Sequence, residues 1–181
     1  MPPEPIKELQ NSLLIADPSL KDGVFDRSVI HLSDYSESEG AIGYILNKPT
    51  DKKVGEVLVD PLFSGLKNIP IYFGGPVGTD HIVFSAYWWD EKIFRYRLRV
   101  SAEEALEMKH RPGSMLIAHV GHSSWYSGQL EKELEENAWF PSQVLPDTIS
   151  LNANHLWKGL LNEMSPYHRL IALTPEDISL N

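Results

Sequence analysis

Short apolar runs separated by turn residues dominate the first half of the chain. Runs at residues 13–16, 29–32 and 41–46 are each followed by turn-forming residues, the last by Asn47-Lys48-Pro49. Short apolar segments bounded in this way are typical of strands buried in a sheet. Similar runs predict further strands at residues 71–73, 82–88, 115–120 and 170–173.

The clearest alternation of apolar and polar side chains lies in residues 94–100. A period of two places four apolar side chains on one face and Arg95, Arg97 and Arg99 on the other. Arginines on the open face of a strand usually keep it soluble and prevent edge pairing. As a nucleic-acid surface this stripe is short, and no recognition helix accompanies it.

Helical spacing is visible in four places. Ser101 and Glu104 have the form of a capping box and predict a helix from about residue 102 to residue 110. Apolar spacing predicts three more helices, one between Thr50 and Pro61 and two at residues 128–137, capped by Ser127, and 154–164. Strands and helices alternate irregularly and short turns join adjacent strands. This pattern favours an α+β fold with a mixed sheet over a doubly wound parallel sheet.

Length and composition fit a single globular domain. The chain has 181 residues, and we expect residues 1–10 to be a flexible segment and residues 11–181 to form the domain. The absence of cysteine excludes disulfides, thiolate metal sites and cysteine nucleophiles. With no visible signal peptide and no apolar run long enough to span a membrane, a cytoplasmic location is expected. The net charge of −9 argues against a protein that grips nucleic-acid phosphates.

Five segments follow one another in a distinctive order. They are Leu13-Leu14-Ile15-Ala16-Asp17-Pro18, Phe25-Asp26-Arg27-Ser28-Val29-Ile30, Gly40-Ala41-Ile42-Gly43-Tyr44-Ile45-Leu46-Asn47-Lys48-Pro49, Tyr72-Phe73-Gly74-Gly75-Pro76-Val77 and Trp125-x-x-Gly128-Gln129-Leu130-x-x-Glu133. Together they resemble the YqgE/AlgH family of bacterial cytosolic proteins. The resemblance implies a compact single domain with a coiled, bifurcated mixed sheet and packed helices. Some members are labelled transcriptional regulators, and the family has no agreed chemistry.

One departure from the family pattern concerns a histidine. Many relatives place a Leu-His pair shortly after the Gly-Gly-Pro-Val turn, where this chain has Ser85-Ala86-Tyr87-Trp88-Trp89. A role that such a histidine has in relatives is therefore not carried over to this chain.

The Gly74-Gly75-Pro76 turn invites comparison with a phosphate-binding loop, because glycines let backbone amides approach an anion. It lacks the Lys-Ser/Thr of a P-loop and the spacing of a dinucleotide site, and the proline removes one amide donor. A tight turn or bulge that redirects the chain is the preferred interpretation.

Gly121-His122-Ser123-Ser124-Trp125 stands where a hydrolase nucleophile elbow would stand, between a strand and a helix. The elbow requires a second glycine, and Trp125 occupies that position. His119 and His122 are expected on opposite faces of a strand, which argues against a shared metal.

Four polar residues stand out beside the predicted strands and helices. Gln129 and Glu133 share one side of a helix near Trp125, where a structural role is favoured over a functional one. Arg27 is a candidate partner of a buried carboxylate such as Asp17. Asn47 is either a turn former or a pocket residue.

The sequence therefore predicts no catalytic residue, metal or cofactor, and one candidate binding pocket. Its candidate residues are Arg27, Asn47, Gly74, Gly75, His122, Trp125 and Gln129. The leading hypothesis is a non-enzymatic regulatory domain that binds an unknown small molecule or protein. The alternatives are a hydrolase around His122, Ser123, Trp125 and Gln129, and a transcriptional regulator. The sequence leaves the oligomeric state open and slightly favours a monomer.

Overall fold

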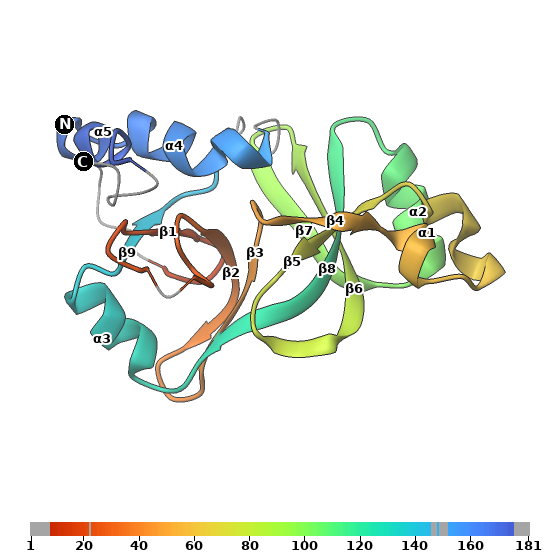
Figure 1. Ribbon diagram of the computed structural model, residues 1–181, viewed down its shortest axis with the longest axis horizontal. Helices are drawn as coiled ribbons and strands as arrows, with labels where there is room; N and C mark the ends of the chain where they lie inside the picture. Colours follow the sequence, from red (N-terminus) through yellow and green to blue (C-terminus); the bar gives the residue numbers. More distant parts are fainter. Residues whose placement is uncertain (1–7, 22, 146–147, 149–151, 176–181) are drawn as a thin grey trace.

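The computed structural model describes residues 8–21, 23–145, 148 and 152–175, which form a mixed sheet with helices packed on it (Figure 1). The strands are β1 (Leu13–Ala16), β2 (Val29–Ser36), β3 (Gly40–Ile45), β4 (Pro49–Lys53), β5 (Pro70–Phe73), β6 (Val77–Asp90), β7 (Ile93–Val100), β8 (Ser114–Trp125) and β9 (Trp139–Ser142). The helices are α1 (Val54–Val57), the 3-10 helix η1 (Pro61–Leu66), α2 (Ala102–His110), α3 (Gln129–Glu135), α4 (Ala153–Glu163) and α5 (Pro166–Ile171).

The sheet branches at β8. One path runs in the order β4-β5-β8-β3-β2-β1-β9, and β6 and β7 leave it because β6 also pairs with β8. The β5–β8 pair is parallel, whereas β8 is antiparallel to both β3 and β6. Figure 1 shows β8 reaching from the half of the sheet beside α1 and α2 to the half beside α3. The fold is therefore a single α+β domain with a coiled, bifurcated mixed sheet, as the family resemblance implies.

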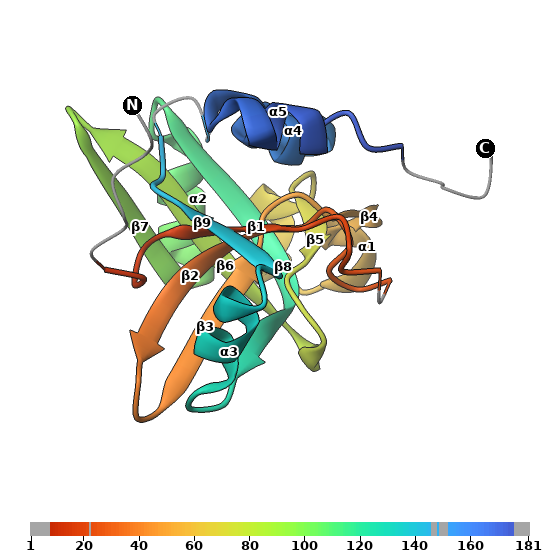
Figure 2. The same ribbon diagram turned by 90° about the vertical axis from the view of Figure 1, so that its left-hand side faces the viewer.

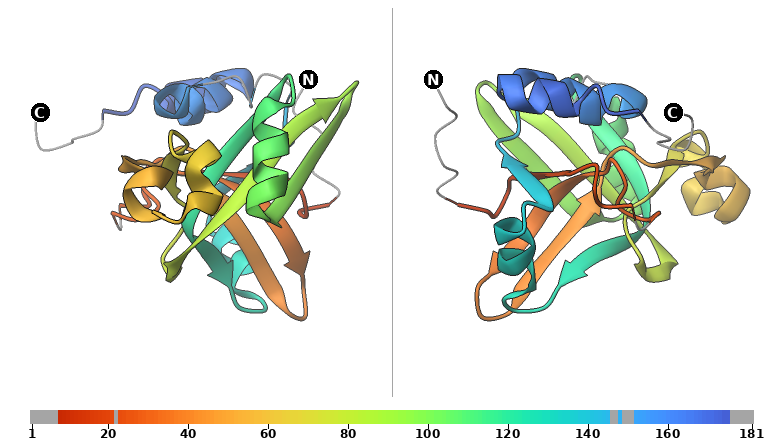
Figure 3. Two further views of the ribbon diagram at one scale, coloured as in Figure 1. Left: turned by 90° about the vertical axis from the view of Figure 1, so that its right-hand side faces the viewer. Right: turned by 60° about the vertical axis from the view of Figure 1, so that its left-hand side comes forward.

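Three apolar clusters fill the spaces between sheet and helices. The first lies under α4, which lies along one side of the sheet together with α5 (Figure 2) and buries Leu156, Trp157, Leu160 and Leu161. The second includes Leu130 of α3, and the third includes Ala102 and Ala105 of α2. Figure 3 shows α2 against the β6–β7–β8 part of the sheet and α3 near β9. Each amphipathic helix thus buries its apolar face on a different part of one branched sheet.

Several local predictions are confirmed. In β7 the three arginines are exposed while the apolar residues between them are at least half-buried. Ser101 Oγ accepts the Glu104 amide at 3.2 Å, and Glu104 Oε2 accepts the Ser101 amide at 3.0 Å, so the capping box at the start of α2 forms as expected.

Other predictions are wrong. Residues 170–173, expected as a strand, contain the end of α5, which begins with Pro166 in its first turn, where proline is compatible with a helix. Ser127 does not cap α3: its hydroxyl donates to the Glu37 carbonyl, and Gly128 in the left-handed conformation occupies the N-cap. Strands β4 and β9 were not predicted.

The predicted boundary between a flexible segment 1–10 and the domain stays a prediction, since residues 1–7 lie outside the described part of the chain. No helix within the described ranges is long and apolar enough to cross a membrane.

Candidate functional site

The seven candidate residues do not meet in one pocket. Arg27 and Asn47 line a common cavity. Gly74 and Gly75 lie against β8, and His122 faces a different cavity. Trp125 and Gln129 belong to the junction between β8 and α3. The structure therefore divides the predicted site into four places.

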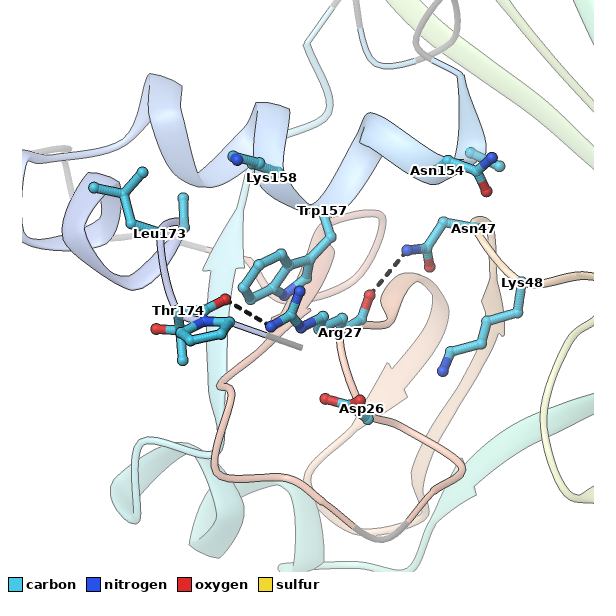
Figure 4. A pocket seen from close by; sticks show the side chains of 12 residues that line it. Asp26, Arg27, Asn47, Lys48, Asn154, Trp157, Lys158, Leu173 and Thr174 are labelled. Atoms are coloured by element: carbon cyan, nitrogen blue, oxygen red, sulfur yellow. Dashed lines mark hydrogen bonds between the residues drawn. The ribbon is translucent and has the colours of Figure 1, made fainter. Parts of the chain in front are cut away.

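The cavity that contains Arg27 and Asn47, called the Arg27 pocket below, has a volume of about 500 Å³. It lies between the segment before β2, the β3–β4 turn, α4 and the segment after α5 (Figure 4). Two of the five family-like segments supply four of its residues, namely Asp26, Arg27, Asn47 and Lys48.

Asn47 joins two of these segments through its side-chain amide. Its Oδ1 accepts the amide of Val29 at 2.8 Å, and its Nδ2 donates to the Arg27 carbonyl at 2.9 Å. Val29 is fully buried, so its amide could not bond to water instead. Asn47 is therefore more than a turn former, because it fixes the backbone that carries Arg27.

Arg27 has a left-handed backbone, with φ of +52°, which is uncommon for a residue with a side chain. Its guanidinium lies 5.0 Å from the centre of the Trp157 ring and donates to the Thr174 carbonyl at 2.7 Å. The expected partner, Asp17, instead accepts the Ser19 amide. Arg27 thus connects the β1–β2 loop to α4 and to the segment after α5.

The Arg27 pocket is cationic. Among the described residues, Arg27, Lys48 and Lys158 line it together with one acidic side chain, Asp26. Figure 4 shows Asp26 and Lys48 on the side of Arg27 away from α4, and Lys158 on α4 itself. The sequence did not identify Trp157 or Lys158 as pocket residues, because Trp157 fits the apolar face of its helix. The signal for Lys48 was its place beside Asn47 in a family-like segment.

The Gly74-Gly75 turn is hydrogen-bonded to strands of the sheet. The Gly74 amide donates to Val120 at 2.8 Å, and its carbonyl accepts from the Ile45 amide at 3.0 Å and from Ser123 Oγ at 3.2 Å. A Cβ atom on either glycine would overlap the backbone of β8 at residues 121–123. This geometry agrees with the expectation of a turn that redirects the chain, since the backbone approach requires glycine.

The nucleophile-elbow alternative fails in its geometry. Gly121 to Trp125 are part of β8, not a strand-to-helix turn, and the fully buried Ser123 hydroxyl donates to a carbonyl. His168 Nδ1 lies 2.8 Å from Ser165 Oγ, within its own helical turn and not beside Ser123. Nothing in this arrangement supports a hydrolase.

His119 and His122 are not separated as expected. The left-handed Gly121, with φ of +71°, interrupts the alternation between them, and both imidazoles lie against the Tyr44 ring at centroid distances of 5.2 and 6.3 Å. No group of three metal-binding side chains occurs among the described residues.

Trp125, Gln129 and Glu133 form a hydrogen-bonded group with Trp139. Glu133 Oε2 accepts both indole N–H groups at 2.8 Å, and Oε1 accepts from Gln129 Nε2 at 2.9 Å. Gln129 also accepts the Tyr126 amide at 3.1 Å. These contacts give Trp125 and Gln129 structural tasks, in agreement with the favoured interpretation.

Comparison with known proteins identifies the family of this chain. A family model described as AlgH-like matches residues 13–168. The chain belongs to this family. A UPF0301 protein of Parabacteroides distasonis is 32% identical over 184 residues, covering 96% of this chain and 91% of its own. A UPF0301 protein of Streptomyces coelicolor is 32% identical over 191 residues, covering 97% of each chain.

Two solved structures resemble the AlgH-like domain described here. The crystal structure of a Corynebacterium diphtheriae protein has a TM-score of 0.72 at 22% identity, covering 94% of this chain and 95% of that one, and it shows the fold alone. The solution structure of the AlgH protein from Pseudomonas aeruginosa, of the UPF0301 group, has a TM-score of 0.58 at 27% identity over 95% and 90% of the chains. AlgH-like relatives are uncharacterised, and no specific function is assigned to this chain by the likeness.

Proposed function

We propose that this protein is a non-enzymatic binding domain of the cytoplasm, and that its Arg27 pocket takes a small anionic metabolite. The observation that carries the proposal is that three cationic side chains, Arg27, Lys48 and Lys158, line one cavity in a chain of net charge −9. A concave site lined by one sign of charge concentrates ligands of the opposite sign. A regulatory role follows if occupancy of the pocket alters contacts with another protein.

The size and shape of the pocket support this proposal. Its volume of about 500 Å³ lies within the range of about 300–1,000 Å³ that is usual for small-molecule sites. The pocket is built from four segments of the chain, and Arg27 joins its own segment to α4 through Trp157 and to the segment after α5 through Thr174.

The experiment is a thermal-shift screen of phosphorylated and carboxylated metabolites, followed by calorimetry of the hits. The double variant Lys48→Gln/Lys158→Gln removes two cations without touching the core and should raise the Kd of a hit at least about tenfold. Lys132→Gln, which removes an exposed lysine of α3, is the matched control and should leave the Kd within about twofold of the original.

A screen without an anionic hit, or a hit whose Kd the double variant leaves unchanged, would overturn the proposal. Binding of an acidic peptide with the same dependence on Lys48 and Lys158 would instead assign the pocket to a protein partner. Direct nucleic-acid binding is not proposed, because the net charge opposes it and Arg97 of the exposed stripe lies 3.5 Å from Glu104.

A further inference from the structure

A second cavity lies where β3, β6, β7 and β8 approach one another. Its volume is about 250 Å³, and it shares no lining residue with the Arg27 pocket. Its lining consists of two histidines, two glycines and three larger side chains, namely Tyr44, Gly78, His81, Val83, Arg99, Gly121 and His122. We call it the Arg99 cavity.

Two irregularities of the sheet shape the Arg99 cavity. Between β6 and β7, Phe84 pairs with Val100 and Ser85 with Leu98, so Arg99 is an extra, bulged residue. Between β6 and β8, the register shifts next to Gly121. Bulges redirect side chains and are frequent beside functional sites. Here two independent bulges turn residues of neighbouring strands toward one cavity.

Arg99 adopts a backbone conformation that disfavours any side chain. Its φ is +55°, a left-handed value at which glycine has no steric penalty and arginine has one. Strained residues of this kind are concentrated at binding sites. The strain sets Arg99 apart from Arg97, which lies on regular strand at the surface, where it contacts Glu104.

Arg99 and Tyr44 line the cavity together. A hydrogen bond to the Tyr44 hydroxyl raises the pKa of Arg99, and Asp34 of β2 adds a smaller effect in the same direction. Tyr44 itself is buried, so its ring is a fixed wall. The arrangement places one cation at the edge of an otherwise mainly apolar cavity.

No carboxylate is among the described residues that line the Arg99 cavity. His122 has its pKa lowered by burial and by the charge of Arg99, so its ring is neutral near pH 7 and presents an aromatic face. His81 contacts Asp80 at 2.8 Å, and both side chains point largely into solvent. The cavity therefore combines one guanidinium with the walls of Tyr44, Val83 and His122.

We propose that the Arg99 cavity binds a small monocarboxylate, with Arg99 pairing the carboxylate and Tyr44, Val83 and His122 packing against its apolar body. A guanidinium forms paired hydrogen bonds with a carboxylate, which matches both charge and planar geometry. The volume is below the lower end, about 300 Å³, of cavities that hold drug-sized ligands. The ligand is accordingly no larger than a single ring or a short branched chain.

The test uses benzoate as the probe and follows the ring protons of His122 by NMR, identified by their loss in His122→Asn. Wild type should show a saturable shift at millimolar benzoate. Arg99→Gly should weaken binding at least about tenfold, the effect of losing a charge-assisted pair. Because glycine accepts the left-handed backbone, its Tm should not fall.

Two controls locate the effect. Arg97→Gln removes a neighbouring arginine of β7 and should leave the benzoate Kd within about twofold. Lys48→Gln/Lys158→Gln should leave the His122 shift intact, which separates this cavity from the Arg27 pocket.

Unmoved His122 signals at millimolar benzoate would overturn the proposal, as would equal binding by wild type and Arg99→Gly. A shift caused by inorganic phosphate but not by benzoate would overturn the carboxylate assignment. A lower Tm for Arg99→Gly, together with no benzoate binding by wild type, would make Arg99 a structural partner of Tyr44 only.

Discussion

At the scale of single residues, two buried histidines are kept neutral by their surroundings. His31 Nε2 lies 2.9 Å from Asn11 Oδ1, so Nε2 carries the proton, and its ring packs against three aromatic rings at centroid distances of 4.6–5.6 Å. His119 Nε2 donates to the Ile45 carbonyl at 3.1 Å. Burial is the main reason that the pKa of each falls from 6.5 to about 3.

These pKa values predict that the protein loses stability in mild acid. Below pH 6.5 the unfolded chain binds protons at His31 and His119 that the folded chain does not bind, down to about pH 3. The free energy of unfolding should fall with decreasing pH in that window, by up to about 1.4 kcal/mol per pH unit for each histidine. Urea denaturation at a series of pH values measures the slope.

The variant His31→Phe isolates one of the two protons. It keeps an aromatic ring among the three rings around position 31. The dependence of the unfolding free energy on pH should become less steep by the contribution of one histidine. The same slope in wild type and variant would show that other groups cause the acid sensitivity.

Asn47 provides a second prediction at this scale. Asn47→Ala leaves the buried amide of Val29 without its acceptor and releases the Arg27 carbonyl, so stability should fall by about 1–3 kcal/mol. Asn47→Asp keeps an acceptor for Val29 but loses the donor and should lie between wild type and Asn47→Ala. Chemical denaturation measures the stability of both variants. An unchanged midpoint for Asn47→Ala would contradict the stabilising role of the two Asn47 hydrogen bonds.

At the scale of elements, Glu133 ties α3 to two strands. Its carboxylate accepts the indole N–H groups of Trp125 in β8 and Trp139 in β9, both of which are buried. Glu133→Ala should cost about 2–4 kcal/mol, because two buried donors lose a charged acceptor. Glu133→Gln retains an oxygen and should cost less than half of that value.

Tryptophan fluorescence during denaturation measures both Glu133 variants. Glu136→Ala, which removes an exposed carboxylate near the end of the same helix, is the control and should change stability by less than about 0.5 kcal/mol. Equal losses of stability in Glu133→Ala and Glu136→Ala would contradict the view that the Glu133 carboxylate stabilises the fold by accepting the two indole N–H groups.

The close approach of the Gly74-Gly75 turn to the β8 backbone leads to a further prediction. Gly75→Ala places a Cβ against the His122 backbone and should destabilise the protein by more than about 3 kcal/mol or prevent folding. Gly113→Ala is the matched control: its φ is +73°, but a Cβ there meets nothing within 4 Å. It should cost only the left-handed strain of about 1–2 kcal/mol. Thermal unfolding of the two variants separates steric overlap from backbone strain.

The sequence predicted correctly those helices and strands that are specified by hydrogen bonds between neighbouring residues or by a clear alternation of apolar and polar side chains. The alternation in β7 before the bulge at Arg99 and the capping box of α2 depend on neighbouring residues, so the sequence was sufficient for both. Strand β9 depends on a partner far along the chain, since it pairs with β1 at the sheet edge, and Pro141 weakens its local signal. In residues 170–173 the apolar run suggested a strand, whereas Pro166 and the preceding Ser165 start a helix whose Leu170 is exposed.

The same contrast applies to the site. Arg27 and Asn47 could be selected because each stands inside a family-like segment next to a buried strand. Trp157 and Lys158 come to the Arg27 pocket from α4, and only tertiary packing brings α4 there. The Arg99 cavity was hidden for another reason, because a regular period of two places Arg99 beside Arg95 and Arg97, and a bulge breaks that period.

At the scale of the whole molecule, α4 closes the largest cluster of the core. It buries four large apolar side chains, and Trp157 Nε1 donates to the Ala16 carbonyl of β1 at 2.8 Å. A chain ending at residue 152 should therefore lose cooperative unfolding and expose apolar surface. Calorimetry and dye binding, compared with a chain ending at residue 175, measure the loss. A cooperative transition in the shorter chain would show that the sheet is stable without α4.

The position of β8 in both branches of the sheet has a consequence for how such chains can change in length. A residue inserted into β8 would shift its register against β3, β5 and β6 at once, and each shift would turn buried side chains outward. The hairpin between β6 and β7 joins only two strands, and a residue added there disturbs no third partner. Insertions and deletions that accumulate over evolutionary time should therefore be found at that hairpin tip and not between Ser114 and Trp125.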